Sequence, residues 1–254
     1  MHDALRTARG VMRSFGIYRG WRGYARAREM DALYRRFIKR GDLVFDIGAH
    51  IGDRVASFRR IGARVVAVEP QPAFAAAIGV LYQHQMLCGR GTTVTIERKA
   101  VGRHSGDVRL MVNTANPTVT TASDAFIHAA QDAPGWQGQH WDKSIVVPMT
   151  TLDALIEDHG TPSFIKIDVE GYEEEALMGL TQPVAALSFE FTTIQREVAR
   201  ACVDRCAALG MTLFNAAIGE SQQIGDWRTA EKMHRWLGEL PQEANSGDVY
   251  ALRP

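Results

Sequence analysis

The sequence predicts a single doubly wound α/β domain, a mostly parallel sheet of about seven strands with helices on both faces, preceded by a helical N-terminal arm. Its 254 residues are enough for one large domain. With 46% hydrophobic and 23% charged residues, the composition is that of a globular protein. From Asp42 onward, short β-branched runs alternate with helical patterns, the order that builds crossover units and a parallel sheet. We expect residues 1–40 to form the arm and residues 41–254 the domain.

The first crossover unit is the clearest part of the pattern. A buried strand at 43–46 leads through a glycine turn into a helix at 53–60, and Gly62 is expected to close that helix at its C-terminal cap. A second buried strand at 64–69 precedes an Ala-rich helix that reaches about Leu87. The other expected elements are strands at 94–98, 108–112, 145–148, 164–168, 185–190, 212–216 and 248–252, and helices at 152–158, 172–178, 195–209 and 229–237. Thr151 is expected to cap the helix at 152–158.

Two features lie between the crossover units. Gly102 and Gly106 predict a hairpin that includes the strand at 108–112. The stretch 113–143 has no clear periodicity, and a connection of that length in a compact domain is usually a lid or a substrate-binding insertion. Its polar residues either line an acceptor pocket or lie in solvent, and its tryptophans either stack on a sugar or anchor the segment to the core. These residues are Asn116, Thr118, Thr120, Thr121 and Ser123, with Trp136 and Trp141.

The arm is basic, since the first 40 residues hold 11 Lys and Arg against 3 Asp and Glu. An amphipathic helix at about 25–38 accounts for this, with an apolar side that packs on the domain and arginines that face water. Its apolar residues are Met30, Leu33, Tyr34 and Phe37. The alternative is an arm that binds nucleic acid or an acidic membrane, which is the weaker interpretation.

Three cysteines, Cys88, Cys202 and Cys206, suggest a reducing compartment without a disulfide framework, and buried apolar roles explain them better than a metal site. The sequence has no apolar run long enough for a signal peptide in its first 20 residues, and no run of about 18 that could span a membrane. We therefore expect a cytoplasmic protein, whose oligomeric state the sequence leaves open.

A carboxylate and a glycine turn end the first strand. Asp46 is followed by Gly48 and Gly52 at the entrance to a helix, where glycines let a ligand approach the backbone and the helix N-terminus favours a carboxylate or a phosphate. Glu69, at the end of the second strand, stands 21 residues after Gly48, the distance at which an acid meets a ribose in dinucleotide folds.

The residue type at position 46 discriminates between a dinucleotide and S-adenosylmethionine as the ligand. A dinucleotide fingerprint has a glycine at this position, because the pyrophosphate lies against the turn, and a carboxylate would repel it. An acid suits the ammonium of a methionine moiety, so S-adenosylmethionine is the expected cofactor. A nicotinamide oxidoreductase on the same kind of sheet remains the alternative, and a non-catalytic nucleic-acid-binding module is a third.

Four segments, found in this order, resemble the FkbM-type methyltransferases. They are FDIGAHIG (45–52), VVAVEP (65–70), the turn 100–102, and FIKIDVEGYEEEALMG (164–179) preceded by TLDAL (151–155). The resemblance covers roughly residues 41–191 and departs from the family at His50, where the family usually has Asn. It implies a seven-stranded methyltransferase sheet, S-adenosylmethionine as methyl donor, and methylation of a hydroxyl group, often on a sugar or a natural product.

The resemblance also implies roles for individual residues. Asp46, Gly48, Ala49 and Gly52 would surround the methionine part, Glu69 would hold the ribose, and residues 99–101 would border the adenine. The residues that we expect to bind the cofactor are Asp46, Gly48, Ala49, His50, Gly52, Glu69, Pro70 and Ala100.

Catalysis is assigned to Asp168 and Glu170, at the end of a core strand where open α/β sheets bind ligands. Either carboxylate could take the proton of an attacking hydroxyl, although alignment of the reacting atoms could supply most of the rate. Glu190 is a weaker candidate. Asp168 and Glu190 could together hold a magnesium ion, but two acids without a clear third ligand favour a site that needs no metal. The acids Glu173, Glu174 and Glu175 are expected only to favour a helix dipole. His50, His104 and His140 are possible bases but more often ordinary histidines.

Overall fold

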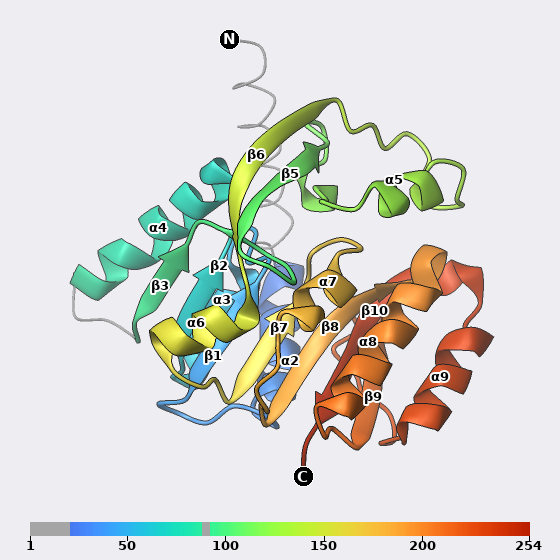
Figure 1. Cartoon of the computed structure of the whole chain (residues 1–254). Coiled ribbons are helices and arrows are strands. Elements are labelled where there is room, and N and C mark those ends of the chain that lie inside the picture. Colours follow the sequence, from blue (N-terminus) through green and yellow to red (C-terminus); the bar gives the residue numbers. More distant parts are fainter. Residues whose placement is uncertain (1–20, 88–91) are drawn as a thin grey trace.

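The computed structural model describes residues 21–87 and 92–254 and contains a seven-stranded sheet (Figure 1). The strand order is β3-β2-β1-β7-β8-β10-β9, in which the first five strands are parallel and β10 runs antiparallel to both of its neighbours. The strands are β3 (Val94–Glu97), β2 (Arg64–Val68), β1 (Leu43–Ile47), β7 (Phe164–Ile167), β8 (Ala186–Thr192), β10 (Ser246–Leu252) and β9 (Leu213–Ile218). The predicted fold class is confirmed.

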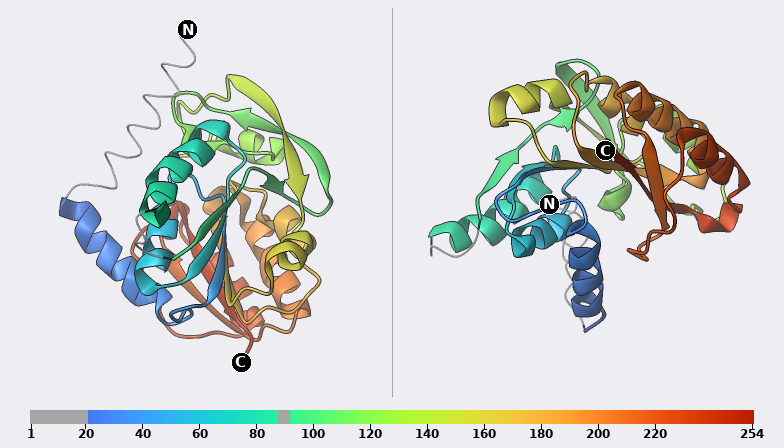
Figure 2. Two further views of the ribbon diagram at one scale, coloured as in Figure 1. Left: turned by 90° about the vertical axis from the view of Figure 1, so that its left-hand side faces the viewer. Right: turned by 90° about the horizontal axis from the view of Figure 1, so that it is seen from below.

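Helices cover both faces of this sheet, as the two rotated views show (Figure 2). One face packs against α2 (Trp21–Tyr34), α3 (Asp53–Ile61) and α4 (Pro72–Leu87). The other face packs against α6 (Leu152–His159), α7 (Glu173–Met178), α8 (Arg196–Ala208) and α9 (Ala230–Glu239), while the short helices η2 (Thr193–Gln195) and η3 (Gln242–Ala244) precede α8 and β10. A parallel sheet that is covered on both sides needs continuous apolar strands, and all five residues of β1 are buried.

The helix caps agree with the sequence. Gly62 ends α3 in the left-handed conformation, and its N–H donates to the carbonyls of Phe58 and Arg59. The hydroxyl of Thr151 accepts from the N–H of Ala154 at 3.1 Å and so caps α6. Both caps were predicted from the residue type at a position just outside an apolar run.

Helix α2 of the arm packs on the domain. Met30, Leu33 and Tyr34 are buried, and the ring of Phe37 stacks on Phe164 and Tyr250 at centroid distances of 5.3 and 5.5 Å. The predicted apolar side of the helix is therefore confirmed, although α2 ends about four residues earlier than expected. The first 20 residues of the arm lie outside the described residues.

A second, three-stranded sheet of order β4-β6-β5 stands beside the main sheet (Figure 1). It comprises β4 (Ala100–Val101), β6 (Lys143–Thr150) and β5 (Gly106–Val112). The predicted hairpin around Gly102 and Gly106 is wrong, because β4 and β5 each pair with β6 and not with one another. Sequence proximity favours a hairpin, but the central strand, β6, follows only after residues 113–142, a segment that we call the excursion.

The excursion, in which the sequence shows no clear periodicity, includes two short helices. It contains η1 (Pro117–Val119) and α5 (Asp124–Ala130), and the hydroxyl of Ser123 caps α5 by accepting from the N–H of Phe126 at 3.0 Å. A helix of seven residues is too short to produce a clear period in the sequence. Phe126 anchors it in a small apolar cluster with Trp136 and Trp141, so both tryptophans hold the segment together.

Two further expectations concern the cysteines and the membrane. Cys202 and Cys206 are fully buried among apolar residues of α8, as predicted, while Cys88 lies outside the described residues. Within residues 21–87 and 92–254, no helix combines the length and the apolar character needed to cross a bilayer.

Candidate functional site

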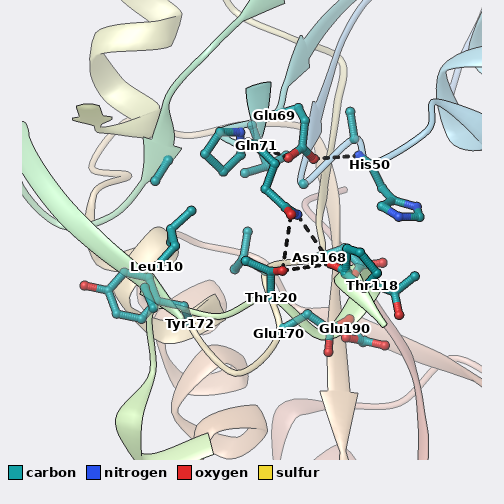
Figure 3. Close-up of a pocket in the computed structure, with 18 of the residues that line it drawn as sticks. His50, Glu69, Gln71, Leu110, Thr118, Thr120, Asp168, Glu170, Tyr172 and Glu190 are labelled. Atoms are coloured by element: carbon teal, nitrogen blue, oxygen red, sulfur yellow. Dashed lines mark hydrogen bonds between the residues drawn. The ribbon is translucent and has the colours of Figure 1, made fainter. Parts of the chain in front are cut away.

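A cavity of about 580 Å³ lies where β1, β2, β7 and β8 end, beneath the three-stranded sheet and the excursion (Figure 3). This is the edge at which open α/β sheets bind ligands, and the volume falls in the range of small-molecule sites. Nine of the ten predicted site residues line it: Asp46, Gly48, Ala49, His50, Glu69, Pro70, Ala100, Asp168 and Glu170. Gly52 is the exception, since it packs behind the turn, where an added Cβ would meet the ring of Tyr82 at 2.9 Å.

Gly48 brings two strand ends into contact. Its φ is +81°, and a Cβ built on it would lie 1.8 Å from the carbonyl oxygen of Asp168. The N–H groups of Gly48 and Ala49 both donate to the carbonyl of Val68, at 2.9 and 3.1 Å. The turn after β1 is therefore held against the turns after β2 and β7, which requires glycine at this position.

Glu69 is fixed by two backbone donors. One carboxylate oxygen accepts from the N–H of His50 at 2.8 Å, and the other accepts from the N–H of Gln71 at 2.8 Å. Burial raises the pKa of Glu69 to about 8, although these two hydrogen bonds lower it. The side chain is only 3% exposed, so its remaining lone pairs are available to a ligand in the cavity and hardly to bulk water.

Asp46 is buried without a complete set of partners. The side chain is 1% exposed, and its Oδ2 atom accepts no hydrogen bond among the described residues. Burial raises the pKa of Asp46 to about 7, against the nearby positive charges of Arg54 and Lys166. A buried, unsatisfied carboxylate oxygen that lines a cavity fits a cationic ligand group.

His50 is a poor base in this position. Burial lowers its pKa to about 4, so the ring is neutral at pH 7, and it packs 4.3 Å from the ring of Phe74. Its φ of +49° lies in the left-handed region, where Asn and His are among the more frequent residues after glycine. Neither His104 nor His140 is among the described residues that line the cavity.

The second half of the site follows β7 and β8. The Nζ atom of Lys166, which is fully buried, lies 3.2 Å from a carboxylate oxygen of Asp168 and 2.8 Å from one of Asp248. Burial alone would lower the pKa of Lys166, but the two carboxylates raise it well above its usual value. Lys166 thereby fixes the orientation of Asp168 at the cavity wall.

Glu170 and Glu173 shape the turn after β7. Glu170 has a φ of +54°, and its carbonyl accepts from the hydroxyl of Thr121 at 2.6 Å, which ties the excursion to this turn. Glu173 was expected only to favour the helix dipole, and that is wrong. Its carboxylate is 3% exposed and accepts from the N–H groups of Val169 and Gly171 at 3.0 and 3.3 Å. Strand-turn-helix spacing alone could not reveal that this acid turns back onto the backbone.

Asp168, Glu170 and Glu190 form a cluster in which one oxygen of each lies within 4.8 Å of the others. Burial raises the pKa of Glu170 and of Glu190 well above the usual value, and the charge of Asp168 adds to both shifts. Three carboxyl groups at this spacing either share protons or hold a hard divalent cation. The expectation that no metal is needed stays a prediction.

Amide and hydroxyl groups of the excursion also line the cavity. Asn116 and Thr118 hydrogen-bond to one another at 2.6 Å, and Thr120 donates to the side chain of Gln71 at 3.3 Å (Figure 3). The structure thus brings three of the five predicted polar residues to the cavity. Thr121 bonds to the turn after β7, and Ser123 caps α5.

A comparison with known families identifies the domain. The profile of the methyltransferase FkbM domain matches residues 46–245. The chain belongs to the FkbM methyltransferase family. The resemblance seen in the sequence is thereby confirmed, and with it the predicted enzyme class of the domain.

Solved structures with a similar fold include a methyltransferase FkbM from Methylobacillus flagellatus KT, with 15% sequence identity and a TM-score of 0.51. That match covers 87% of this chain and 47% of the other, so this chain spans about half the length of that relative. A magnesium protoporphyrin IX methyltransferase from Synechocystis with bound S-adenosylmethionine matches at 10% identity and a TM-score of 0.45, covering 91% and 79% of the two chains. A comparison with curated proteins gives no match.

Several residues that line the cavity of this FkbM domain were missed in the sequence. Arg54 lies two residues after Gly52, and an arginine in the first turn of that helix could have drawn attention. Gln71 lies two residues beyond Glu69. Glu220 comes from the turn after β9, which approaches the site only through the antiparallel end of the sheet, and no spacing in the sequence signals it.

Carboxyl groups outnumber basic groups in the cavity wall. Seven of the described lining residues are acids, and two, Arg54 and Lys99, are basic. The whole chain has a formal net charge of zero, so this is a local concentration of carboxyl groups. A cavity of this kind favours a cationic ligand over a pyrophosphate.

Proposed function

We propose that this FkbM domain transfers a methyl group from S-adenosylmethionine to a hydroxyl oxygen of a small molecule, sugar or natural product. The observation that carries the proposal is the pair of buried carboxyl groups, Asp46 and Glu69, that flank a glycine turn in a cavity with seven acids in its wall. When bound, S-adenosylmethionine supplies an activated methyl group on a cationic sulfur. Asp46 would face the ammonium group, and Glu69, held in place by two N–H donors, would accept from the ribose hydroxyls.

Asp168 and Glu170 are proposed to act on the acceptor. A hydroxyl oxygen that takes up the methyl group must lose its proton, and a carboxylate within hydrogen-bonding reach can receive it. Lys166 keeps Asp168 in one orientation, which suits it to this role. The amide and hydroxyl groups from Asn116 to Thr120 that also line the cavity offer hydrogen bonds to a polar, hydroxyl-bearing acceptor. Orientation of the reacting atoms in the cavity accounts for much of the rate, since it can lower a barrier by about 7–11 kcal/mol.

A nicotinamide oxidoreductase is the less favoured alternative. Its pyrophosphate would have to lie beside Asp46 in a wall with seven acids and two cations, which is electrostatically unfavourable. Calorimetry separates the two proposals, because the methyltransferase should bind S-adenosylhomocysteine with a micromolar dissociation constant and show no heat with NADH. Absence of binding at near-millimolar S-adenosylhomocysteine would refute the proposed function.

The acceptor and the catalytic acid need a second experiment. Isotope-labelled S-adenosylmethionine, incubated with the protein and an extract of its source cells, should yield a labelled product whose methyl group mass spectrometry places on oxygen. Asp168→Asn should reduce turnover at least tenfold, with the dissociation constant for S-adenosylhomocysteine changed less than threefold, because the residue is proposed to contact the acceptor. Unchanged turnover in this variant would remove Asp168 from the mechanism.

A further inference from the structure

In the cavity wall, one buried polar atom of an acidic side chain and one of a basic side chain lack a hydrogen-bond partner among the described residues. Asp46 and Arg54 both line the cavity, and Oδ2 of the aspartate and Nε of the arginine are buried without a partner among the described residues. Buried polar atoms are nearly always paired in folded proteins, so such atoms in a cavity wall point to a ligand. An acid and a base that are both incompletely paired suit a ligand that carries both charges.

Arg54 is held firmly at this wall. Its side chain is 11% exposed, its Nη1 atom lies 3.1 Å from a carboxylate oxygen of Asp53, and its Nη2 atom lies 3.2 Å from one of Glu220. Arg26 of helix α2 contacts the same two acids, at 2.8 and 2.6 Å. Two acids from different parts of the chain therefore fix the guanidinium without using all five of its N–H donors.

The start of helix α3 also favours an anion here. Arg54 is the second residue of the helix, and the N-cap is Gly52, which has a φ of +79° and no side chain to accept from the first-turn N–H groups. Helix N-termini carry a partial positive charge and point N–H groups outward, and a nearby guanidinium adds to both effects. An anionic group at this position would meet Arg54 and the end of the helix together.

The other cation in the described cavity wall lies elsewhere. Lys99 follows β3, and its Nζ atom lies 3.0 Å from Glu97. The sequence resemblance places Lys99 beside the adenine, and Glu69 holds the ribose under the proposed function. The amino-acid end of the donor then extends past Gly48 toward the start of α3, where Arg54 is the cation within reach.

We propose that Arg54 binds the carboxylate of the donor's methionine moiety while Asp46 faces its ammonium group. The inference rests on the proposed function and adds to it a residue that neither the family profile nor the sequence motif assigns. A carboxylate brought into a wall with seven acids would be repelled unless a cation received it. Arginine suits this role because its planar guanidinium presents N–H donors to a carboxylate in a fixed geometry.

The test compares ligands that differ only in the carboxylate. Calorimetry should use S-adenosylhomocysteine and its decarboxylated counterpart, which keeps the amine and therefore carries one more positive charge. An acidic cavity without a carboxylate site would bind the decarboxylated ligand more tightly. We expect the reverse, with S-adenosylhomocysteine bound about 10- to 100-fold more tightly, the size of a charge-assisted hydrogen bond.

Two variants locate the effect. Arg54→Gln should bring the two affinities to within about threefold of one another, and Asp46→Asn should weaken both ligands, because both keep the amine. The matched control is Arg26→Gln, which removes a cation from the same two acids at a position that is not among the described lining residues. It should preserve the preference for S-adenosylhomocysteine.

The possible outcomes are distinct. Equal affinity of the unmodified chain for the two ligands would overturn the inference, and this measurement needs no variant. An equal loss of both ligands in Arg54→Gln, or loss of the preference in Arg26→Gln as well, would also overturn it. Thermal melting should check that Arg54→Gln is folded. If Arg54→Gln does not fold, Arg54→Lys replaces it. This variant keeps the positive charge but lacks the planar guanidinium, so it should lose part of the preference for S-adenosylhomocysteine. If neither ligand binds to the unmodified chain, the proposed function itself fails.

Discussion

The contact between the turns after β1 and β7 gives a sharp test of how the cavity is built. Gly48 has a φ of +81°, and an added Cβ would lie 1.8 Å from the backbone carbonyl oxygen of Asp168. Gly48→Ala must therefore push the end of β7 away from the end of β1 by about 1 Å or more. We expect this variant to lose stability and donor binding together.

The expected loss has two parts. A left-handed conformation costs a residue with a Cβ about 1–2 kcal/mol relative to glycine. Forcing an extra carbon into a packed contact costs about 1–3 kcal/mol more, because a backbone carbonyl cannot rotate away as a side chain does. Gly48→Ala should thus reduce the free energy of unfolding by about 2–5 kcal/mol.

Gly41→Ala is the matched control. Gly41 also has a positive φ, +90°, but nothing lies within 4 Å of the Cβ that the substitution would add. It should lose only the conformational part, about 1–2 kcal/mol, and should bind S-adenosylhomocysteine as the unmodified chain does. Urea unfolding measures the free energies and calorimetry measures the binding. If the two variants have the same unfolding midpoint, the close approach of the turns is not a constraint on the fold.

Three further predictions concern the charges of the site. Burial raises the pKa of Asp46 to about 7 and that of Glu69 to about 8, and a cationic ligand prefers the ionised forms of both. The affinity for S-adenosylmethionine, measured by calorimetry, should therefore rise at least tenfold from pH 6 to pH 8. A pH-independent affinity, or a pH dependence that is equally steep in Glu69→Gln, would contradict this. Lys166→Met leaves two carboxylates without their buried partner and should cost about 3–5 kcal/mol in urea unfolding, whereas a neutral effect would mean that Lys166 does not hold Asp168. Methyl transfer should stay within about twofold in excess chelator, since a cation needs ionised ligands and burial raises the pKa of Glu170 and of Glu190, which disfavours their ionised forms; a loss that magnesium restores would establish a metal site.

The sequence was sufficient for the main sheet because its signals are local. A buried strand, a glycine turn and a capped helix follow one another within 20 residues, and each step has a residue type that explains it, from Asp46 to Gly62. The same holds for Thr151 at the start of α6. Most of the predicted site residues reach the cavity for the same reason, since parallel strands must present their carboxyl ends at one edge.

The features that the sequence did not reveal depend on contacts between distant segments. Strand β5 pairs with β6 across the whole excursion, and the carboxylate of Glu173 accepts from the N–H groups of Val169 and Gly171. No periodicity in the sequence predicts either contact. Arg54 and Glu220 meet only because the turn after β9 approaches the start of α3. Such contacts are set by the tertiary packing of the sheet ends and not by local propensity.

The buried acids link ligand binding to stability. Asp46 and Glu69 have higher pKa values in the folded chain than the usual values of unfolded aspartate and glutamate, so the folded state without ligand binds more protons than the unfolded state. Its stability should therefore fall as the pH rises from about 4 to about 8. A cationic donor favours the ionised carboxylates and offsets this loss, which adds to the stabilisation that any ligand gives by mass action. The increase in melting temperature produced by S-adenosylmethionine should consequently be larger at pH 8 than at pH 6, because the unsatisfied charges that it neutralises are present only at the higher pH.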